Sequence, residues 1–350
     1  MCTRIYNNNE GTIFTTGRSM DWRQQLDTSM YVFPKGTRKS GLPGEDGSNP
    51  LPVRWTSKYA SAVTMVGDMA SSDGINSEGL VANVLYQSTC EYAPILEDEK
   101  RAGLSVLRWV QYVLDNFKTA EEVRNAFEDN KTMVIVPAKV PEPGGEPKDA
   151  DLHLSVSDRE GGSVIIEIND GRYDVSYSPT YRVMTNDPKF HKQLELNQYW
   201  EWQWDRVNNT HPSDTLPGSP FSPDRFAKAS YYINHLENAK TEQEAVAQMF
   251  SVIMNASVPM GYVLSPDEPN ISQTLWSTVG SHQSRCYYFR DVLTPNVFWT
   301  NLEKQDELPP IGEGNDCWIL RLKEGEEFLY HAGCVNKDYQ PGQDPFAIDL

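Results

Sequence analysis

Residues 1–22 read MCTRIYNNNEGTIFTTGRSMDW. Residues 3–6 and 12–17 of this stretch have the composition of two short strands, because β-branched and aromatic side chains dominate them. Residues 7–11 between them are Asn, Asn, Asn, Glu and Gly, and Asn and Gly tolerate the positive φ of a tight loop. The stretch therefore predicts a hairpin whose second strand returns towards the N-terminus.

Cys2 is the residue of this hairpin that carries the most chemical information. Initiator methionine is removed when the next side chain is small, so the mature chain could begin with Cys2, which would then carry a thiol and a free α-amine. An α-amine titrates near 7.7–8.0 and a free thiol near 8.5, so a proton passes between them at little cost at neutral pH. This combination predicts a nucleophile with its own base. The alternative is that Cys2 is merely a terminal residue.

Arg18 and Asp21 follow in the segment that the hairpin returns to Cys2. A guanidinium beside the thiol would favour the thiolate, and a carboxylate would hold the amine. Residues three apart face opposite sides of a regular strand, so we expect the strand to end or bulge between them. The alternative is an ordinary ion pair on the surface.

The rest of the chain alternates blocks of strands with two blocks of helices. Helical periodicity is clearest at residues 104–114, 119–129, 188–204, 222–236 and 241–254. Thr119 with Glu122, and Thr241 with Glu244, have the spacing of capping boxes. Strands are predicted at residues 30–34, 62–67, 80–86, 132–136, 152–157, 163–168, 173–177, 181–184, 275–279, 285–289, 297–300, 317–322 and 327–330. This grouping predicts an α+β fold with mainly antiparallel sheets, formed as one domain by residues 2–350 once Met1 is removed.

Composition excludes several classes of partner. The 350 residues carry 31 Lys and Arg against 49 Asp and Glu, a formal charge of −18. Such a charge disfavours nucleic acids and anionic membranes, and no apolar stretch is long enough to span a bilayer. The N-terminus has no signal-peptide pattern, so we expect a cytoplasmic protein, or a periplasmic one if a signal was removed. Five dispersed cysteines indicate neither a zinc site nor a disulfide framework, and we expect no metal and no cofactor.

Six short motifs are spread along the chain: MCT at residues 1–3, GRSMD at 17–21, DGINSEGL at 73–80, AN at 82–83, TNDP at 185–188 and SPDRF at 222–226. Together they resemble the choloylglycine hydrolase family of linear amide C–N hydrolases, which includes penicillin V acylases and bile salt hydrolases. The resemblance covers essentially the whole chain. It implies an N-terminal nucleophile hydrolase with a four-layer αββα sandwich.

The resemblance assigns a role to each motif. Cys2 matches the nucleophile, with Arg18 and Asp21 as its electrostatic partners. Asn186 matches an amide donor to the oxyanion, and Asn83 a second donor through its backbone N–H. Arg225 matches a charged residue that braces the site. Read without the resemblance, Asn83 could be a polar residue of an edge strand, Asn186 part of a helix entry, and Arg225 a surface charge in a first helical turn.

Trp22 and Tyr86 place two aromatic side chains beside the predicted site. They would narrow and flatten the acyl pocket, which suits a phenoxyacetyl ring or a slim alkyl chain better than a steroid. The chain thus resembles the Gram-negative penicillin V acylase branch, with conjugated bile salts and acyl homoserine lactones as alternative substrates. Both aromatics could instead belong to the core.

We therefore expect a small-molecule acyl amide as substrate, cleaved through a thioester on Cys2. A hypothesis from another class is a non-catalytic ligand-binding protein whose N-terminus stays blocked by Met1. The aromatic residues 199–204 predict a subunit contact or core packing. Because the family is often tetrameric and residues 205–221 resemble its assembly region, we also expect a homo-oligomer, with a tetramer as the first expectation.

Overall fold

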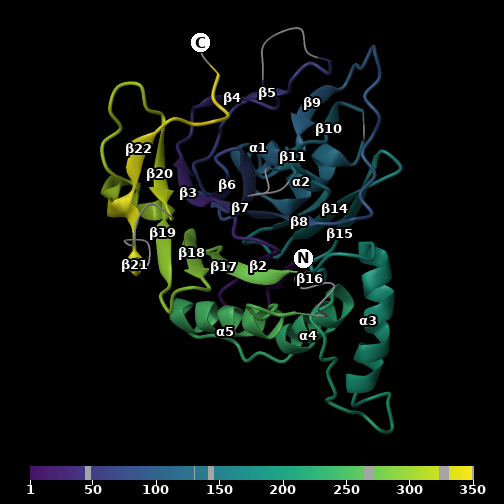
Figure 1. The fold of residues 1–350 in the computed structure, drawn as a ribbon. Helices are drawn as coiled ribbons and strands as arrows, with labels where there is room; N and C mark the ends of the chain where they lie inside the picture. Colours follow the sequence, from purple (N-terminus) through teal and green to yellow (C-terminus); the bar gives the residue numbers. More distant parts are fainter. Residues whose placement is uncertain (44–48, 130, 141–145, 264–271, 323–330, 349–350) are drawn as a thin grey trace.

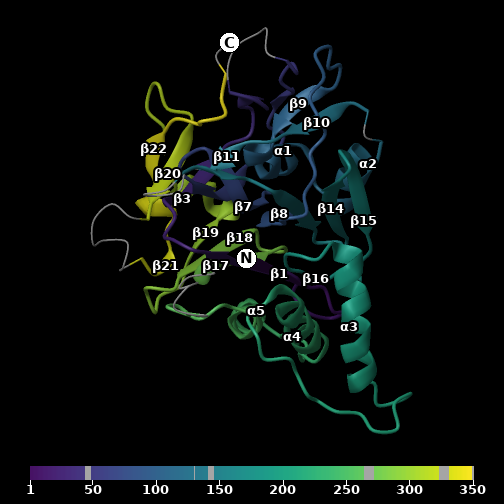
Figure 2. The ribbon, with the colours of Figure 1, turned by 45° about the vertical axis from the view of Figure 1, so that its right-hand side comes forward.

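The computed structural model describes residues 1–43, 49–129, 131–140, 146–263, 272–322 and 331–348. Within these residues two large sheets stack face to face, and helices cover both outer faces (Figures 1 and 2). The four-layer αββα arrangement and the α+β class expected from the sequence are confirmed. Buried apolar side chains from both sheets and from the covering helices form one continuous core.

Cys2 lies in the first of the two sheets, which the described residues form from seven strands. Its pairs are antiparallel except for the last, between β19 and β21. In spatial order the strands are β16 (Val183–Met184), β1 (Cys2–Asn7), β2 (Thr15–Trp22), β17 (Gln273–Ser281), β18 (Cys286–Asp291), β19 (Phe298–Asn301) and β21 (Gly333–Cys334).

The second sheet has nine strands in the described part of the chain, and all of its pairs are antiparallel. In spatial order they are β15 (Arg172–Tyr177), β14 (Ser163–Asn169), β13 (Leu152–Ser157), β8 (Val81–Tyr86), β7 (Ala70–Asn76), β6 (Ser61–Val66), β3 (Thr28–Phe33), β20 (Cys317–Arg321) and β22 (Gln340–Gly342). Three small ladders complete the strands: β4 (Arg38–Ser40) with β5 (Arg54–Thr56), β9 (Ala102–Ser105) with β10 (Met133–Val136), and β11 (Lys139–Val140) with β12 (Lys148–Asp149).

Helices α4 (Ser222–Asn234) and α5 (Glu242–Asn255) cover the first sheet, and α1 (Trp109–Asn116) and α2 (Ala120–Phe127) cover the second. Helix α3 (Phe190–Trp204) packs on α4 and extends beyond the sandwich (Figure 1). Among the described residues no helix is both long and apolar enough to cross a membrane.

Capping explains where two of these helices begin. Thr241 and Glu244 form the complete predicted capping box at the start of α5. Thr119 accepts the predicted bond from the Glu122 N–H, but the Glu122 carboxylate bonds the Lys118 N–H instead, so this box is half formed.

The helix predicted from residue 104 begins at Trp109. Residues 102–105 pair with β10 as a strand, and a 3₁₀ turn follows at Val106–Arg108. The strand predicted at residues 327–330 lies outside the described residues.

The predicted hairpin is confirmed, but its second strand begins at Thr15 instead of residue 12 and ends at Trp22 instead of residue 17. Residues 15–20 of β2 pair with β1, and the strand continues without a break to Trp22, with Asp21 and Trp22 paired to β17. The irregularity lies in the neighbouring strand β17, between Thr274 and Trp276. Arg18 and Asp21 therefore face opposite sides of the sheet: Arg18 faces the second sheet, and Asp21 faces α4. Our expectation that β2 itself ends or bulges between them was wrong.

His282 joins the two sheets at the end of β17. Its Nδ1–H donates to the Gly79 carbonyl at 2.7 Å, and its Nε2 accepts from the Thr16 hydroxyl at 2.8 Å. Burial lowers the pKa of His282 to about 3, with a smaller opposing effect of the Gly79 bond. Because the folded pKa lies below the unfolded one, the neutral ring stabilises the fold fully above about pH 6.5, and this stability is lost as the pH falls towards 3.

We predict that His282 makes the fold sensitive to mild acid. Between pH 7 and pH 5, linkage at this ring should cost about 2 kcal/mol of unfolding free energy, which a His282→Asn protein would not lose. Urea unfolding of both proteins at the two pH values measures this difference. Equal losses in the two proteins would contradict the assignment.

Candidate active site

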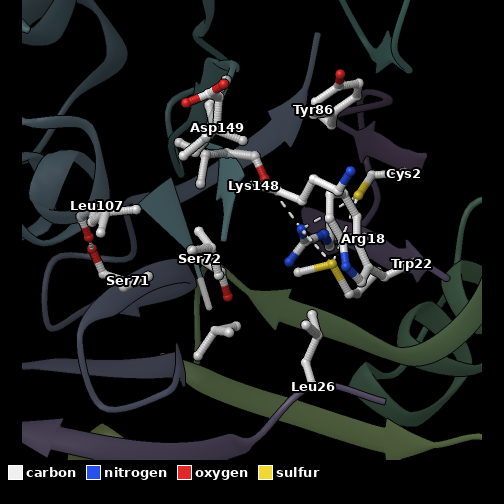
Figure 3. A pocket seen from close by; sticks show the side chains of 17 residues that line it. Cys2, Arg18, Trp22, Leu26, Ser71, Ser72, Tyr86, Leu107, Lys148 and Asp149 are labelled. Atoms are coloured by element: carbon white, nitrogen blue, oxygen red, sulfur yellow. Dashed lines mark hydrogen bonds between the residues drawn. The ribbon is translucent and has the colours of Figure 1, made fainter. Parts of the chain in front are cut away.

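The Cys2 thiol lies at the start of β1, in the layer between the two sheets. The residue is only 2% exposed, and its Sγ lies 3.5 Å from Arg18 Nη2 and 3.9 Å from Met20 Sδ. Met20 is also the residue that Cys2 faces across the hairpin. The hairpin register therefore brings Arg18 and Met20 to the thiol, and Figure 3 shows Arg18 beside Cys2.

Arg18 is a buried cation held from several directions. Its Nη2 donates to the Val84 carbonyl at 3.1 Å, and its Nη1 lies 3.6 Å from Asp73 Oδ2. The guanidinium also stacks over the Trp276 ring, at 4.6 Å from the centroid. At 1% exposure Arg18 is not part of a surface ion pair, so that alternative was wrong.

Asp73 is the buried counter-ion of Arg18, and the sequence did not single it out as a site residue. Its carboxylate accepts hydrogen bonds from Tyr287 Oη at 2.7 Å, Asn83 Nδ2 at 2.8 Å and Thr278 Oγ1 at 3.2 Å. Burial raises the pKa of Asp73, while the Arg18 charge and these three bonds oppose the rise. The four partners come from both sheets.

Asn83 lies in β8, between β7 and β13, so the reading of it as an edge-strand residue was wrong. Its side-chain amide points to Asp73 rather than to the thiol. The neighbouring residue Val84 binds Arg18 through its carbonyl, which brings β8 close to Cys2. The expected backbone role of Asn83 stays a prediction.

Asp21 and Arg225 meet on the helix side of Cys2. Arg225 Nη1 lies 3.6 Å from Asp21 Oδ2 and donates to the Cys2 carbonyl. Asp21 Oδ1 accepts from the Thr274 hydroxyl at 2.6 Å. Burial lowers the pKa of Arg225, and the nearby Asp21 charge opposes this. Arg225 is fully buried, so the alternative of a surface charge was wrong.

Asn186 contacts the backbone nitrogen of Cys2. Its Oδ1 accepts from Cys2 N at 2.8 Å and from Arg225 Nη2 at 2.6 Å, and its Nδ2 donates to the Tyr86 carbonyl at 2.6 Å. Because a guanidinium can only donate, Arg225 fixes which end of the amide faces Cys2. The second N–H of Nδ2 remains a candidate donor to a substrate oxygen.

The segment that carries Asn186 is anchored at both ends. The Asn186 N–H donates to the Ser222 hydroxyl at 2.9 Å, and the Asp187 carboxylate accepts from the N–H groups of Ser88 and Thr89. Helix α3 begins at Phe190, just after this segment. The helix-entry reading of residues 185–188 is therefore compatible with a role of Asn186 in the site.

Trp22 and Tyr86 line a cavity that leads to Cys2. Their rings meet edge to face at 6.0 Å between centroids. The cavity has a volume of about 80 Å³ and a mostly apolar lining, and Lys148 and Asp149 of β12 are among the residues that line it (Figure 3). The remaining lining residues are Cys2, Arg18, Met20, Leu26, Val66, Ala70, Ser71, Ser72, Val84, Leu107, Val140, Ala150 and Leu152.

Met1 precedes Cys2 and is held by the backbone of Asp21. The Met1 amine donates to the Asp21 carbonyl at 2.8 Å and to the Ser272 hydroxyl at 3.3 Å. Burial lowers the pKa of this amine. While Met1 is attached, Cys2 N is a peptide nitrogen without a basic lone pair.

Sequence reasoning missed Asp73, Met20, Thr278 and Tyr287. Asp73 and Met20 lie inside motifs that the sequence did single out. Met20 contacts Cys2 across the hairpin, whereas Thr278 and Tyr287, which bind Asp73, lie more than 200 residues further along the chain. Among the described residues no group of His, Cys, Asp and Glu side chains could hold a metal ion.

Comparisons with known proteins identify the family of the chain. The family model for linear amide C–N hydrolases, choloylglycine hydrolase family, matches residues 2–317. The chain is 38% identical over 348 residues to penicillin V acylase of Pectobacterium atrosepticum, and the alignment covers 95% of this chain and 87% of that protein. It is 24% identical over 315 residues to a bile salt hydrolase/transferase of Bifidobacterium longum, which covers 85% of this chain and 94% of that protein.

Two solved structures share the fold. Penicillin V acylase from Agrobacterium tumefaciens matches with a TM-score of 0.81 at 38% identity and covers 100% of both chains. A conjugated bile acid hydrolase from Clostridium perfringens matches with a TM-score of 0.68 at 21% identity, over 87% of this chain and 93% of that one. Since the family model spans nearly the whole chain and the fold agrees, this chain belongs to the choloylglycine hydrolase family of linear amide C–N hydrolases.

Proposed function

We propose that the mature chain, residues 2–350 in one domain, hydrolyses acyl amides through a thioester on Cys2. One observation carries the proposal: the thiol and the backbone nitrogen of the same residue have separate buried partners. The thiol lies beside Arg18, and the nitrogen lies beside Asn186 Oδ1. Removal of Met1 turns that nitrogen into an amine, which can act as a base.

In the first step the thiol proton passes to the α-amine, and Sγ forms a bond to the substrate carbonyl carbon. Arg18 stabilises the developing thiolate. Asn186 Oδ1 accepts one N–H of the amine, and Asp21 Oδ2, which has no hydrogen-bond partner among the described residues, offers a negative charge nearby. Arg225 holds these two residues in place.

The carbonyl oxygen becomes an oxyanion, which the free N–H of Asn186 Nδ2 and the backbone N–H of Asn83 would receive. When the C–N bond breaks, the ammonium of Cys2 returns the proton to the leaving amine. Water then gives a proton to the α-amine and its hydroxide to the thioester carbonyl. The C–S bond breaks, and the proton returns to the thiol.

The acyl group fits the cavity beside Trp22 and Tyr86. The edge-to-face pair borders a mostly apolar space that suits a phenoxyacetyl ring or a slim alkyl chain. Similarity to two penicillin V acylases supports a phenoxyacetyl amide as the first substrate to test. A side-by-side assay of penicillin V, glycocholate and a long-chain acyl homoserine lactone tests this order. Hydrolysis of glycocholate alone would instead favour the bile salt hydrolase alternative.

Substituting the aromatic pair tests the pocket assignment. Trp22→Val or Tyr86→Val should lower phenoxyacetyl amide hydrolysis about two- to twelvefold, because such a pair contributes about 0.5–1.5 kcal/mol beyond buried area. The same change relieves steric exclusion of bulky acyl groups, so the ratio of glycocholate to penicillin V turnover should rise. Steady-state rates on both substrates give this ratio.

Tyr112→Val is the matched control, because Tyr112 forms a similar edge-to-face pair with Trp55 outside the cavity. It should leave the ratio unchanged. If the ratio stays flat in both Trp22→Val and Tyr86→Val, these aromatics are core residues and the preference for phenoxyacetyl amides loses its basis.

We infer a homo-oligomer, and a tetramer stays the first expectation from the family resemblance; the exposed aromatic residues of helix α3 support a contact between subunits but not a particular subunit number. The aromatic residues at the C-terminal end of α3 differ in exposure. Trp204 is 9% exposed and packs on Tyr231, whereas Tyr199 and Trp202 are 56% and 53% exposed. Exposed aromatics on a projecting helix favour a contact with another subunit. Light scattering coupled to gel filtration measures the subunit number.

A further inference from the structure

Asp73 has no part in the proposed chemical steps, yet its carboxylate, near the thiol, forms an ion pair and accepts three hydrogen bonds. It is 1% exposed and does not line the substrate cavity. One oxygen, Oδ2, faces Arg18 and accepts from Asn83 and Thr278, and the other accepts from Tyr287. An isolated buried charge would be costly, so this arrangement is built to keep a carboxylate beside Arg18.

The Arg18 guanidinium therefore lies between the Cys2 thiol, whose anionic form it favours, and the Asp73 carboxylate, which offsets its charge. Its Nη2 faces Cys2 Sγ, and its Nη1 faces Asp73. The positive charge favours the thiolate, whereas the Asp73 charge partly cancels that field. Within the described residues, other ionisable or charged groups near Cys2 or lining its cavity are Asp21 on β2, Arg225 on α4, Tyr86 on β8, Lys148 and Asp149 on β12, and the terminal amine. Tyr287 on β18 contacts Asp73.

We propose that Asp73 is a positioning residue that acts through Arg18: it holds the guanidinium and limits how strongly Arg18 favours the thiolate of Cys2. This inference rests on the proposed function and deepens it. Without the Asp73 charge, Arg18 would stabilise the Cys2 thiolate together with a protonated α-amine. A protonated amine cannot accept a proton, so it could not act as the base. A more acidic thiol is also a weaker nucleophile, with a Brønsted slope of about 0.4–0.5.

The local contacts allow an isosteric test. In Asp73→Asn the side-chain oxygen can still accept from Asn83 and Thr278, while the new NH₂ donates to Tyr287 Oη. Tyr287 can pass its own proton to Thr64, whose Oγ1 lies 2.7 Å away. Arg18 keeps its bond to Val84 and its stacking on Trp276. The substitution therefore removes the charge and little else.

The test measures the rate of Cys2 alkylation by iodoacetamide against pH, with the Cys2 peptide followed by mass spectrometry. In Asp73→Asn the midpoint of this curve should move to lower pH by about one unit, as expected for one charge removed across a guanidinium. The turnover number should fall about threefold, and the Michaelis constant should stay unchanged because Asp73 lies outside the cavity.

Two further variants distinguish a shift of the alkylation midpoint caused by the Asp73 charge from one caused by a general loss of packing. Tyr287→Phe removes one hydrogen bond to the Asp73 carboxylate and favours its neutral form, so it should move the midpoint in the same direction by less. Asp115→Asn is the matched control, because Asp115 is another fully buried carboxylate with a cation, Lys39 Nζ, at 3.2 Å. It lies on α1 in the outer helix layer and should leave the midpoint unchanged.

A midpoint that does not move in Asp73→Asn and Tyr287→Phe, or that moves to higher pH, would overturn the inference. So would a shift of equal size in Asp115→Asn. Alkylation needs no turnover, so the two proposals fail separately. If the expected shifts are found in a protein that hydrolyses no acyl amide, the role of Asp73 stands and the proposed function is contradicted.

Discussion

Cys2→Ala is expected to lower amide hydrolysis to below a few per cent of the wild-type rate while the fold stays intact. The alanine side chain removes the nucleophile, and loss of a covalent nucleophile costs roughly 10³-fold or more. Cys2→Ser should lose nearly as much, because a hydroxyl is a far weaker acid than a thiol and the Arg18 site favours a thiolate. Steady-state kinetics measure the loss of hydrolysis, and circular dichroism shows whether the fold stays intact.

The pair of substitutions keeps methionine removal constant, since alanine and serine are also small. Any difference from wild type therefore reports on the side chain and not on the N-terminal amine. Turnover above a few per cent in Cys2→Ala, in a preparation free of wild-type protein, would end the nucleophile hypothesis.

Asn186→Ala is expected to lower turnover roughly 10²-fold or more, with a smaller change in the Michaelis constant. Its amide would meet a charge that develops only in the transition state, so its loss affects turnover more than substrate binding. The measurement is a full steady-state curve on the best substrate of the panel. An unchanged turnover number with a raised Michaelis constant would make Asn186 a ground-state binding residue.

Asn186→Asp separates the two ends of the amide. The carboxylate keeps an oxygen for Cys2 N and for Arg225 but has no N–H to offer an oxyanion. It should therefore be as slow as Asn186→Ala. Recovery of turnover in Asn186→Asp would show that only the contact with the amine is needed.

The sequence correctly predicted elements whose local residue preferences match the structure that the rest of the chain imposes on them. The α5 helix begins one residue after Thr241 because its capping box satisfies the first N–H groups without help from the rest of the chain. The opening hairpin likewise follows from its own strand and loop residues. The end of β2 could not be predicted, since Asp21 and Trp22 lie beyond the residues that pair with β1 and are paired with β17 instead.

Strand β7 was missed for a related reason. Its sequence, ASSDGIN, contains Ser, Asp, Gly and Asn, most of which are rare in strands. It is extended because β6 and β8 pair with it on both sides, and its one carboxylate is compensated by Arg18 of the other sheet. Tertiary contacts of this kind override local propensity, and they leave no periodic signal in the sequence.

The candidate site could be predicted as a set of residues but not as a geometry. The motifs named Cys2, Arg18, Asp21, Asn186 and Arg225, and the structure brings these five together. The counter-ion Asp73 was not predicted, because its part depends on which face of β2 Arg18 occupies. Nor could the sequence tell that the Asn83 side chain points to Asp73 and away from the thiol.

Intact-mass and peptide mass spectrometry of the enzyme, acid-quenched during turnover of its best substrate, tests the central claim most directly. The account predicts a chain that begins at Cys2 and carries the acyl group as a thioester on the Cys2 peptide, and predicts that hydroxylamine removes this group. Active enzyme that retains Met1, or an acyl group bound to a different residue, would contradict the claim that Cys2 is both nucleophile and base.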